Sequence, residues 1–322
     1  MAMGAADVIP GVSGGTIAFI TGIYEKLIGS LNSVDLEAVK LLFTGKWKAL
    51  EEKINGYFLI ALVSGILLAV LSLAKLIKFL LSNHEIALWS FFFGLIVAST
   101  FVIGKTIKWE IKDFIGLIAG AAIAFYLTTV SPIDMPDTPL YLFFAGVISI
   151  IAMILPGISG SFILVILGKY KYIISIVSDI SEGLKGIISS VIKGDFNGIP
   201  PYWASMDVLT LLIFWLGTLT GILGFSRVLN WLFSKFRNLT IALLTGFMIG
   251  SLNKVWPWKH TISIYTDRHG NVRPLVQESV LPGTFNELTG NESFLSTALG
   301  LAILGFAIVF ILEYVSNKKK LA

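Results

Sequence analysis

Two short stretches of this chain have the residue types that bind anions through the backbone. Pro10-Gly11-Val12-Ser13-Gly14-Gly15 lies near the start, and Pro156-Gly157-Ile158-Ser159-Gly160-Ser161 lies near the middle. Proline fixes a turn, glycine permits positive φ, and the residues after serine open a helix whose first N–H groups have no partner. A helix N-terminus carries roughly half a positive charge, so we expect each stretch to hold an anion.

Two alternatives use the same residues. Each stretch could be only a packed kink in which serine caps its own helix. Gly11-Val12-Ser13-Gly14-Gly15 also fits the nucleophile elbow G-x-S-x-G, and both copies fit the G-x-S-G of intramembrane serine proteases. A serine nucleophile needs a positioned base, however, and His84, His260 and His269 fall at a helix start or in a long polar segment. We therefore expect a protein that is not an enzyme.

The composition indicates the setting of these stretches. The chain has 322 residues, of which 55% are hydrophobic and 14% charged, and its mean hydropathy is +0.84. This is far more apolar than a soluble domain, so we predict a polytopic membrane protein built from helices. A net charge of +4 gives no reason to expect nucleic acid, and the absence of cysteine removes thiolate metal sites. No metal or cofactor is predicted.

Apolar segments predict the helices that position the two stretches. Residues 4–29 and 139–178 contain the Pro-Gly breaks and are predicted to be re-entrant hairpins. Six further segments are long enough to span a membrane: 57–81, 86–104, 113–130, 208–226, 238–253 and 294–314. Residues 254–293 are predicted to form an extramembrane loop to which no function is assigned. Within it, Trp256-Pro257-Trp258 with Lys254 and Lys259 suggests an interfacial aromatic belt first and a headgroup contact second.

The chain repeats itself at two offsets. At an offset of 146, eight residues from Pro10 to Tyr24 are identical to residues from Pro156 to Tyr170. At an offset of 152, Gly94 and Ser99 fall on Gly246 and Ser251. We predict two repeats, residues 1–138 and 139–322, each with one hairpin and three spans. Because three spans separate the hairpins, the repeats should be inverted.

Three charged side chains are candidates for the same site. Lys75 falls on Arg227 at the offset of 152, and the pair could supply charge to a bound phosphate, or could instead extend to the membrane interface. Asp7 has no counterpart, because Met153 occupies its position; it is a candidate for proton coupling, or a solvated group at the interface. The predicted substrate-binding residues are Pro10, Gly11, Ser13, Gly14, Gly15, Thr16, Pro156, Gly157, Ser159, Gly160, Ser161, Lys75 and Arg227.

The chain resembles the polyprenyl-phosphate transporter family, formerly a domain of unknown function. The resemblance rests on Gly4 to Tyr24, on Pro156 to Tyr170, and on Phe91 to Gly94 with Gly246 to Trp258. It implies a flippase that returns undecaprenyl phosphate, the carrier lipid of cell-wall synthesis, from the outer to the inner leaflet of the bacterial cytoplasmic membrane. The expected partners are this lipid, membrane lipids and a coupling proton or cation.

The loop charges bear on orientation, and one function remains open beside the flippase. Lysines in the segment 105–112 and in the C-terminal tail predict that both termini are cytoplasmic. An ion-coupled carrier or channel for a small soluble anion would use the same two stretches without a lateral opening to lipid.

Overall fold

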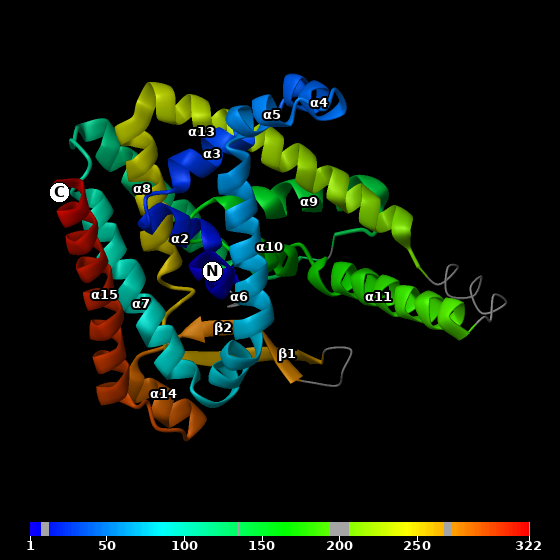
Figure 1. Ribbon diagram of the computed structural model, residues 1–322. Helices are drawn as coiled ribbons and strands as arrows, with labels where there is room; N and C mark the ends of the chain where they lie inside the picture. Colours follow the sequence, from blue (N-terminus) through cyan, green and yellow to red (C-terminus); the bar gives the residue numbers. More distant parts are fainter. Residues whose placement is uncertain (8–12, 134, 194–205, 267–271, 322) are drawn as a thin grey trace. The chain divides into compact units, whose positions relative to one another are not determined.

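The computed structural model describes residues 1–7, 13–133, 135–193, 206–266 and 272–321. Nearly all of the elements are helices (Figure 1). In chain order they are α1 (Ala2–Asp7), α2 (Gly14–Ile20), α3 (Tyr24–Asn32), α4 (Leu36–Phe43), α5 (Trp47–Ile54), α6 (Gly56–Asn83), α7 (Glu85–Gly104), α8 (Ile111–Thr129), α9 (Pro139–Ile154), α10 (Gly160–Ile166), α11 (Tyr170–Lys193), α13 (Val208–Ser251), β1 (Lys259–Thr266), β2 (Val272–Ser279), α14 (Pro282–Thr289) and α15 (Leu295–Leu321).

Long apolar helices make this an all-α polytopic membrane protein, as predicted. Among the described residues, four helices are long and apolar enough to cross a membrane, namely α6, α7, α8 and α13. The bent pair of α10 and α11 would make a fifth if it were one span. The apolar part of α15, Leu295–Ile311, is shorter.

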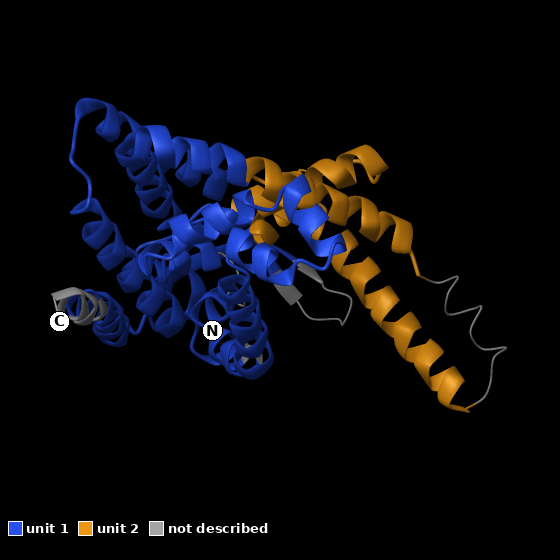
Figure 2. Cartoon of the chain, turned by 45° about the horizontal axis from the view of Figure 1, so that its top comes forward, with its two compact units in different colours: residues 1–130, 153–159, 226–322 blue, residues 131–152, 160–225 orange. Residues whose placement is uncertain are grey.

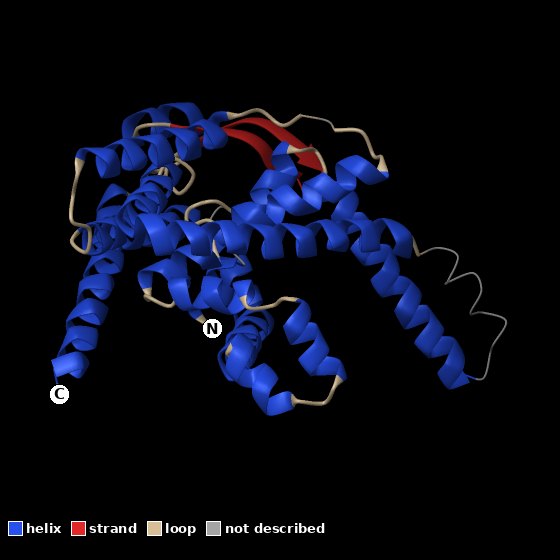
Figure 3. Ribbon diagram, turned by 90° about the horizontal axis from the view of Figure 1, so that it is seen from above, coloured by secondary structure: helices blue, strands red, loops and turns tan. Residues whose placement is uncertain are grey.

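Helix α13 covers both predicted spans 208–226 and 238–253. Its 44 residues form two helices joined at a kink, where Phe236 has non-helical backbone angles. One region differs in form from what the sequence suggests. Residues 254–293 are not a plain loop, because β1 and β2 pair as an antiparallel hairpin, followed by α14 (Figure 3). The alternation of Thr261, Ile262, Ser263 and Ile264 suits a strand, although we expected none.

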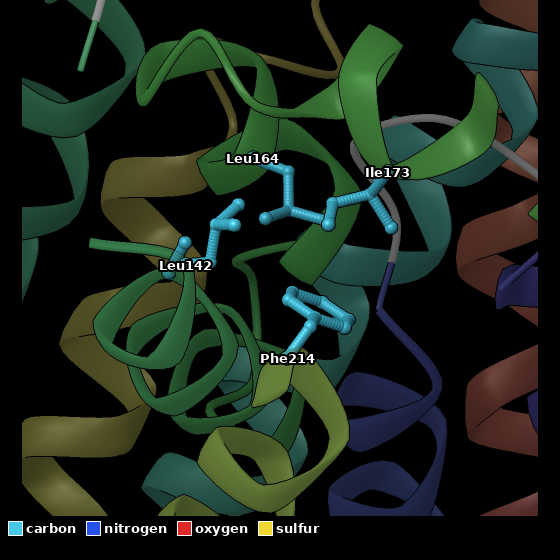
Figure 4. Close-up of a cluster of buried hydrophobic side chains, with 5 residues drawn as sticks. Leu142, Leu164, Ile173 and Phe214 are labelled. Carbon is cyan, nitrogen blue, oxygen red and sulfur yellow. The ribbon is translucent and has the colours of Figure 1, made fainter. Parts of the chain in front are cut away.

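The chain forms two compact units, which do not coincide with the predicted repeats (Figure 2). One consists of residues 1–130, 153–159 and 226–322, and the other of residues 131–152 and 160–225. The second unit has its own apolar core, in which Leu142 of α9, Leu164 of α10, Ile173 of α11 and Phe214 of α13 face one another (Figure 4). This core joins the helix before the second Pro-Gly stretch to the helices after it.

Glycines bring two helix pairs of the first unit into close backbone contact. Helices α7 and α15 lie side by side (Figure 1), and a Cβ added to Gly305 would lie 2.1 Å from the carbonyl oxygen of Phe91. Helices α8 and α13 pack in the same way, since a Cβ added to Gly120 would lie 2.2 Å from the carbonyl oxygen of Leu243. The offset of 152 pairs Phe91 with Leu243, and an offset of 185 pairs Gly120 with Gly305.

Candidate functional site

The helices that follow the two Pro-Gly stretches have the same local structure. Helices α2 and α10 both have seven residues, and they begin at positions 14 and 160, which the offset of 146 pairs. Each ends in a turn at a glycine with positive φ, 72° at Gly22 and 69° at Gly168. The backbone N–H of Ile23 then donates to the oxygen of Ala18, and that of Lys169 to the oxygen of Leu164. Both copies therefore form the same short helix and the same reversal.

The first N–H groups of α2 already have partners within the protein. Ser13 is the N-cap, and its Oγ accepts a hydrogen bond from the N–H of Gly15 at 3.1 Å. The N–H of Gly14 donates to Oδ1 of Asp7 at 2.7 Å. The expectation that these groups lack partners is therefore wrong for Gly14 and Gly15. A carboxylate occupies the end of α2 where we predicted an external anion.

Side chains in and just after the first stretch bind the backbone just before the second. The hydroxyl of Ser13 donates to the carbonyl oxygen of Met153 at 2.9 Å, and the hydroxyl of Tyr24 donates to that of Ile154 at 3.1 Å. These carbonyls end α9 and have no partner within their own helix. In the other direction, the N–H of Gly157 donates to Oγ1 of Thr16 at 2.8 Å. Residues 13–24 and 153–157 thus form one hydrogen-bonded cluster, which we call the motif junction.

Two glycines make the motif junction possible. A Cβ on Gly15 would lie 2.5 Å from the carbonyl oxygen of Ile154, so α2 can approach the end of α9 only without a side chain there. Gly157 has a φ of 89°, and its Cβ would lie 2.7 Å from Oγ of Ser251. The backbone conformation and the space around Gly157 both favour glycine.

The predicted site residues fall into three groups. Ser13, Gly14, Gly15, Thr16, Pro156, Gly157, Ser159 and Gly160 are buried, whereas Ser161 is exposed. Pro10 and Gly11 lie outside the described residues. Lys75 on α6 and Arg227 on α13 are exposed, so their predicted contact with substrate is not part of the motif junction.

Two residues near the stretches have roles that we did not predict from the sequence. Tyr24 belongs to the motif junction, and its identity with Tyr170 at the offset of 146 was an available signal. Lys169 is 1% exposed and pairs with Asp137 in the second unit. Its counterpart in the first repeat is Ile23, so self-comparison gives no indication of Lys169.

The surroundings of Ser13 suit hydrogen bonding rather than nucleophilic attack. Ser13 is 1% exposed, and its hydroxyl donates to backbone carbonyls. His84 lies between α6 and α7, and His260 lies in β1; His269 lies outside the described residues. No general base contacts Ser13 among the hydrogen bonds found for the described residues.

Comparison with known proteins gives the family. The model of the undecaprenyl phosphate translocase-like family matches residues 3–273. The chain belongs to this family. It is 40% identical to the polyprenyl-phosphate transporter of Vibrio cholerae serotype O1, over 99% of this chain and 95% of the relative. It is 33% identical to the polyprenyl-phosphate transporter of Staphylococcus aureus, over 80% of this chain and 83% of that relative. No solved structure was found to match the chain.

Membership in the undecaprenyl phosphate translocase-like family agrees with the resemblance seen in the sequence. It makes this chain a bacterial membrane transporter rather than an enzyme. The intramembrane protease alternative is therefore set aside. Membership in the family does not assign roles to the residues of the motif junction.

Proposed function

We propose that this protein is a flippase for a polyprenyl phosphate such as undecaprenyl phosphate, which it returns from the outer to the inner leaflet of the bacterial cytoplasmic membrane. Both curated relatives are named for polyprenyl-phosphate transport, which supports the substrate class. The observation that carries the site is the hydrogen bonding of Ser13 and Thr16 to residues 153–157. The phosphate binds beside this motif junction, because moving a bare phosphate through hydrocarbon is prohibitive. The prenyl chain stays in lipid.

Equivalent contacts support two inverted repeats as the moving parts. Gly305 contacts Phe91, and Gly120 contacts Leu243. In each contact one residue belongs to the first half of the chain and its partner to the second, and the glycine comes from opposite halves, as a two-fold axis would require. A second pair of contacts corresponds in the same way: Gly94 lies close to Ala302, and Gly246 lies close to Leu117. Rocking of one repeat against the other then alternates access, with both termini in the cytoplasm.

Asp7 gives the proposed cycle a coupling group. Its carboxylate binds the N–H of Gly14, which is the kind of donor that a phosphate oxygen needs. Phosphate and Asp7 compete for the end of α2, and protonation of Asp7 favours the phosphate. Lys75 and Arg227 attract the headgroup as it approaches along exposed faces of α6 and α13.

A reconstituted flip assay tests the function and its site together. Proteoliposomes hold a radiolabelled prenyl phosphate, and phosphatase added outside hydrolyses only the outer-leaflet lipid. With the wild type we expect hydrolysis to continue into the inner-leaflet pool. Ser13→Ala and Thr16→Val should slow this phase, whereas Ser72→Ala should not, because the hydroxyl of Ser72 bonds within α6 on an exposed face.

Two results would overturn the proposal. Unchanged flipping in both Ser13→Ala and Thr16→Val would remove the motif junction from the substrate path. Inhibition by soluble phosphate as strong as that by an added prenyl phosphate would favour the small-anion carrier instead. The same assay under imposed pH gradients tests whether transport is proton-coupled.

A further inference from the structure

A half-open pocket lies where the hairpin and α14 face the start of α7. It has a volume of about 360 Å³ and is lined by Glu85 and Ile86 of α7, by Lys259, His260 and Thr261 of β1, and by Gln277, Phe285, Leu288 and Asn291 among others. In Figure 1 the start of α7, the strands and α14 gather in one region. This is enough room for a small headgroup and its first carbons.

Lys259 gives the pocket its charge. Its ammonium lies 4.4 Å from the centre of the Trp89 ring and donates a hydrogen bond to the carbonyl oxygen of Lys254. Burial and the nearby charge of Lys254 lower the pKa of Lys259 to about 7. An anion bound next to Lys259 favours its protonated form, because a neighbouring opposite charge raises the pKa of a lysine.

Glu85 only partly balances the positive charge of Lys259 and the nearby Lys254. It is the one carboxylate among the residues lining the pocket, and its Oε1 accepts a hydrogen bond from Nε1 of Trp89 at 3.2 Å. The lining also contains the side chains of His260, Gln277 and Asn291, which can donate hydrogen bonds to phosphate oxygens. The polar lining of the pocket therefore suits an anion with several oxygens.

The pocket also has apolar lining, and its neighbours are typical of a membrane surface. Ile86, Phe285 and Leu288 line the pocket. Beside it, the rings of Trp256 and Trp258 lie 5.5 Å apart, and Phe93 of α7 contacts Trp256. Tryptophan clusters at the end of a membrane helix mark the level of lipid headgroups. A ligand here can leave its chain in the bilayer.

We propose that this pocket binds the phosphate monoester headgroup of an amphiphilic lipid at the membrane face, with Lys259 as the cationic contact and Leu288 beside the first carbons. The choice of a prenyl phosphate as this lipid rests on the function proposed above. The pocket holds the headgroup at the membrane surface, outside the transport step at the motif junction. It raises the local concentration of substrate on one side of the membrane.

Amine footprinting of the full-length wild-type protein tests the site directly. An amine-reactive acetylating reagent is applied at pH 7.5 with geranylgeranyl phosphate, geranylgeraniol, phosphatidylglycerol or inorganic phosphate, and mass spectrometry follows each lysine. At ten times its dissociation constant, geranylgeranyl phosphate should slow acetylation of Lys259 about tenfold. Acetylation of Lys46, an exposed side chain before α5, should not change.

The comparison lipids distinguish the possible ligands. Equal protection by inorganic phosphate, by phosphatidylglycerol or by geranylgeraniol would overturn a site for an amphiphilic phosphate monoester, and so would the absence of protection by all four.

Lys259→Gln provides the second measurement. In the flip assay this variant should need several-fold more substrate for half-maximal rate and keep its maximal rate, whereas Ser13→Ala loses maximal rate. An unchanged concentration dependence would overturn the site. Protection of Lys259 in a wild-type protein that moves no lipid would overturn the proposed function alone, and transport without protection would overturn this pocket alone.

Discussion

Oδ1 of Asp7 accepts a hydrogen bond of 2.7 Å from the backbone N–H of Gly14, so the N-terminus of α2 holds an internal carboxylate. A negative charge at a helix N-terminus is stabilising by about 0.3–1 kcal/mol on an exposed helix and by more when partly buried. The N-terminus of this short helix thus favours the binding of a negatively charged group. In our proposal that group alternates between Asp7 and the phosphate of the substrate.

Asp7→Asn should tighten substrate binding. The amide keeps the size of the carboxylate but not its charge, so a phosphate meets weaker competition at Gly14. We expect the half-saturating concentration of prenyl phosphate to fall by about two- to fivefold, which corresponds to about 0.4–1 kcal/mol. The dependence of flipping on a pH gradient should also disappear.

Asp35→Asn is the matched control for Asp7→Asn. Asp35 is the N-cap of α4, and its Oδ1 accepts from the N–H of Ala38 at 2.9 Å. Its carboxylate pairs with Lys53 of α5 and not with the motif junction. Flip assays on both variants across a pH gradient test whether Asp7 couples transport to protons. Equal behaviour of the two variants would contradict a role for Asp7 in coupling.

Gly15→Ala should destabilise the protein through the motif junction. The added methyl group meets the carbonyl oxygen of Ile154 at 2.5 Å, and such overpacking costs about 1–3 kcal/mol. Gly157→Ala adds backbone strain at a φ of 89° to a similar clash. Both variants should lower the midpoint of thermal unfolding in detergent.

Gly29→Ala serves as the control, because nothing lies within 4 Å of its added Cβ in α3. Alanine there should leave the midpoint unchanged or raise it, since it is the better helix former. A midpoint for Gly15→Ala equal to that of Gly29→Ala would show that α2 does not need its close contact with α9.

Gly120→Ala and Gly305→Ala should cost similar stability. The first places a methyl group 2.2 Å from the oxygen of Leu243 and the second 2.1 Å from the oxygen of Phe91, in contacts that the proposed two-fold relation makes equivalent. We expect each to lower the free energy of unfolding by about 1–3 kcal/mol. Gly300→Ala on α15 has open space and should have little effect. Widely different losses for Gly120→Ala and Gly305→Ala would argue against a two-fold relation between the helix pairs.

Lys259 should make stability depend on pH. Burial and Lys254 lower its pKa from 10.5 to about 7, so between these values the unfolded chain binds more protons than the folded one. Stability should therefore rise with pH from about 7 toward 10.5. Lys254 adds to this rise above about 8, because burial lowers its pKa as well, while Glu85 opposes the shift of Lys259.

Thermal unfolding at several pH values measures this dependence. Lys259→Gln should flatten the rise between pH 7 and 8, where Lys254 contributes little. Lys46→Gln, which alters an exposed side chain, should leave it unchanged. A wild-type stability that does not change over this range would mean that Lys259 keeps its charge in the folded protein and that burial does not lower its pKa.

Much of the architecture follows from local features of the sequence. Apolar segments identify the membrane class, and the identities between Pro10 and Tyr24 and between Pro156 and Tyr170 anticipate the equal helices α2 and α10. These features are accessible because a glycine with positive φ, such as Gly22 or Gly168, acts on its own neighbours. The hairpin of β1 and β2 was missed because short alternating strands give a weak signal inside a polar segment.

The composition of the site depends on contacts that no local pattern contains. Ser13 and Met153 are 140 residues apart, and their hydrogen bond exists only because the packing of the helices brings the end of α9 to the start of α2. The same holds for Lys259 and Trp89, which the chain separates but the fold places in contact. The sequence indicates that the Pro-Gly stretches can bind a negative group through their N–H donors. The folded chain shows that Asp7 is already there, because a helix end buried in protein needs a partner of its own.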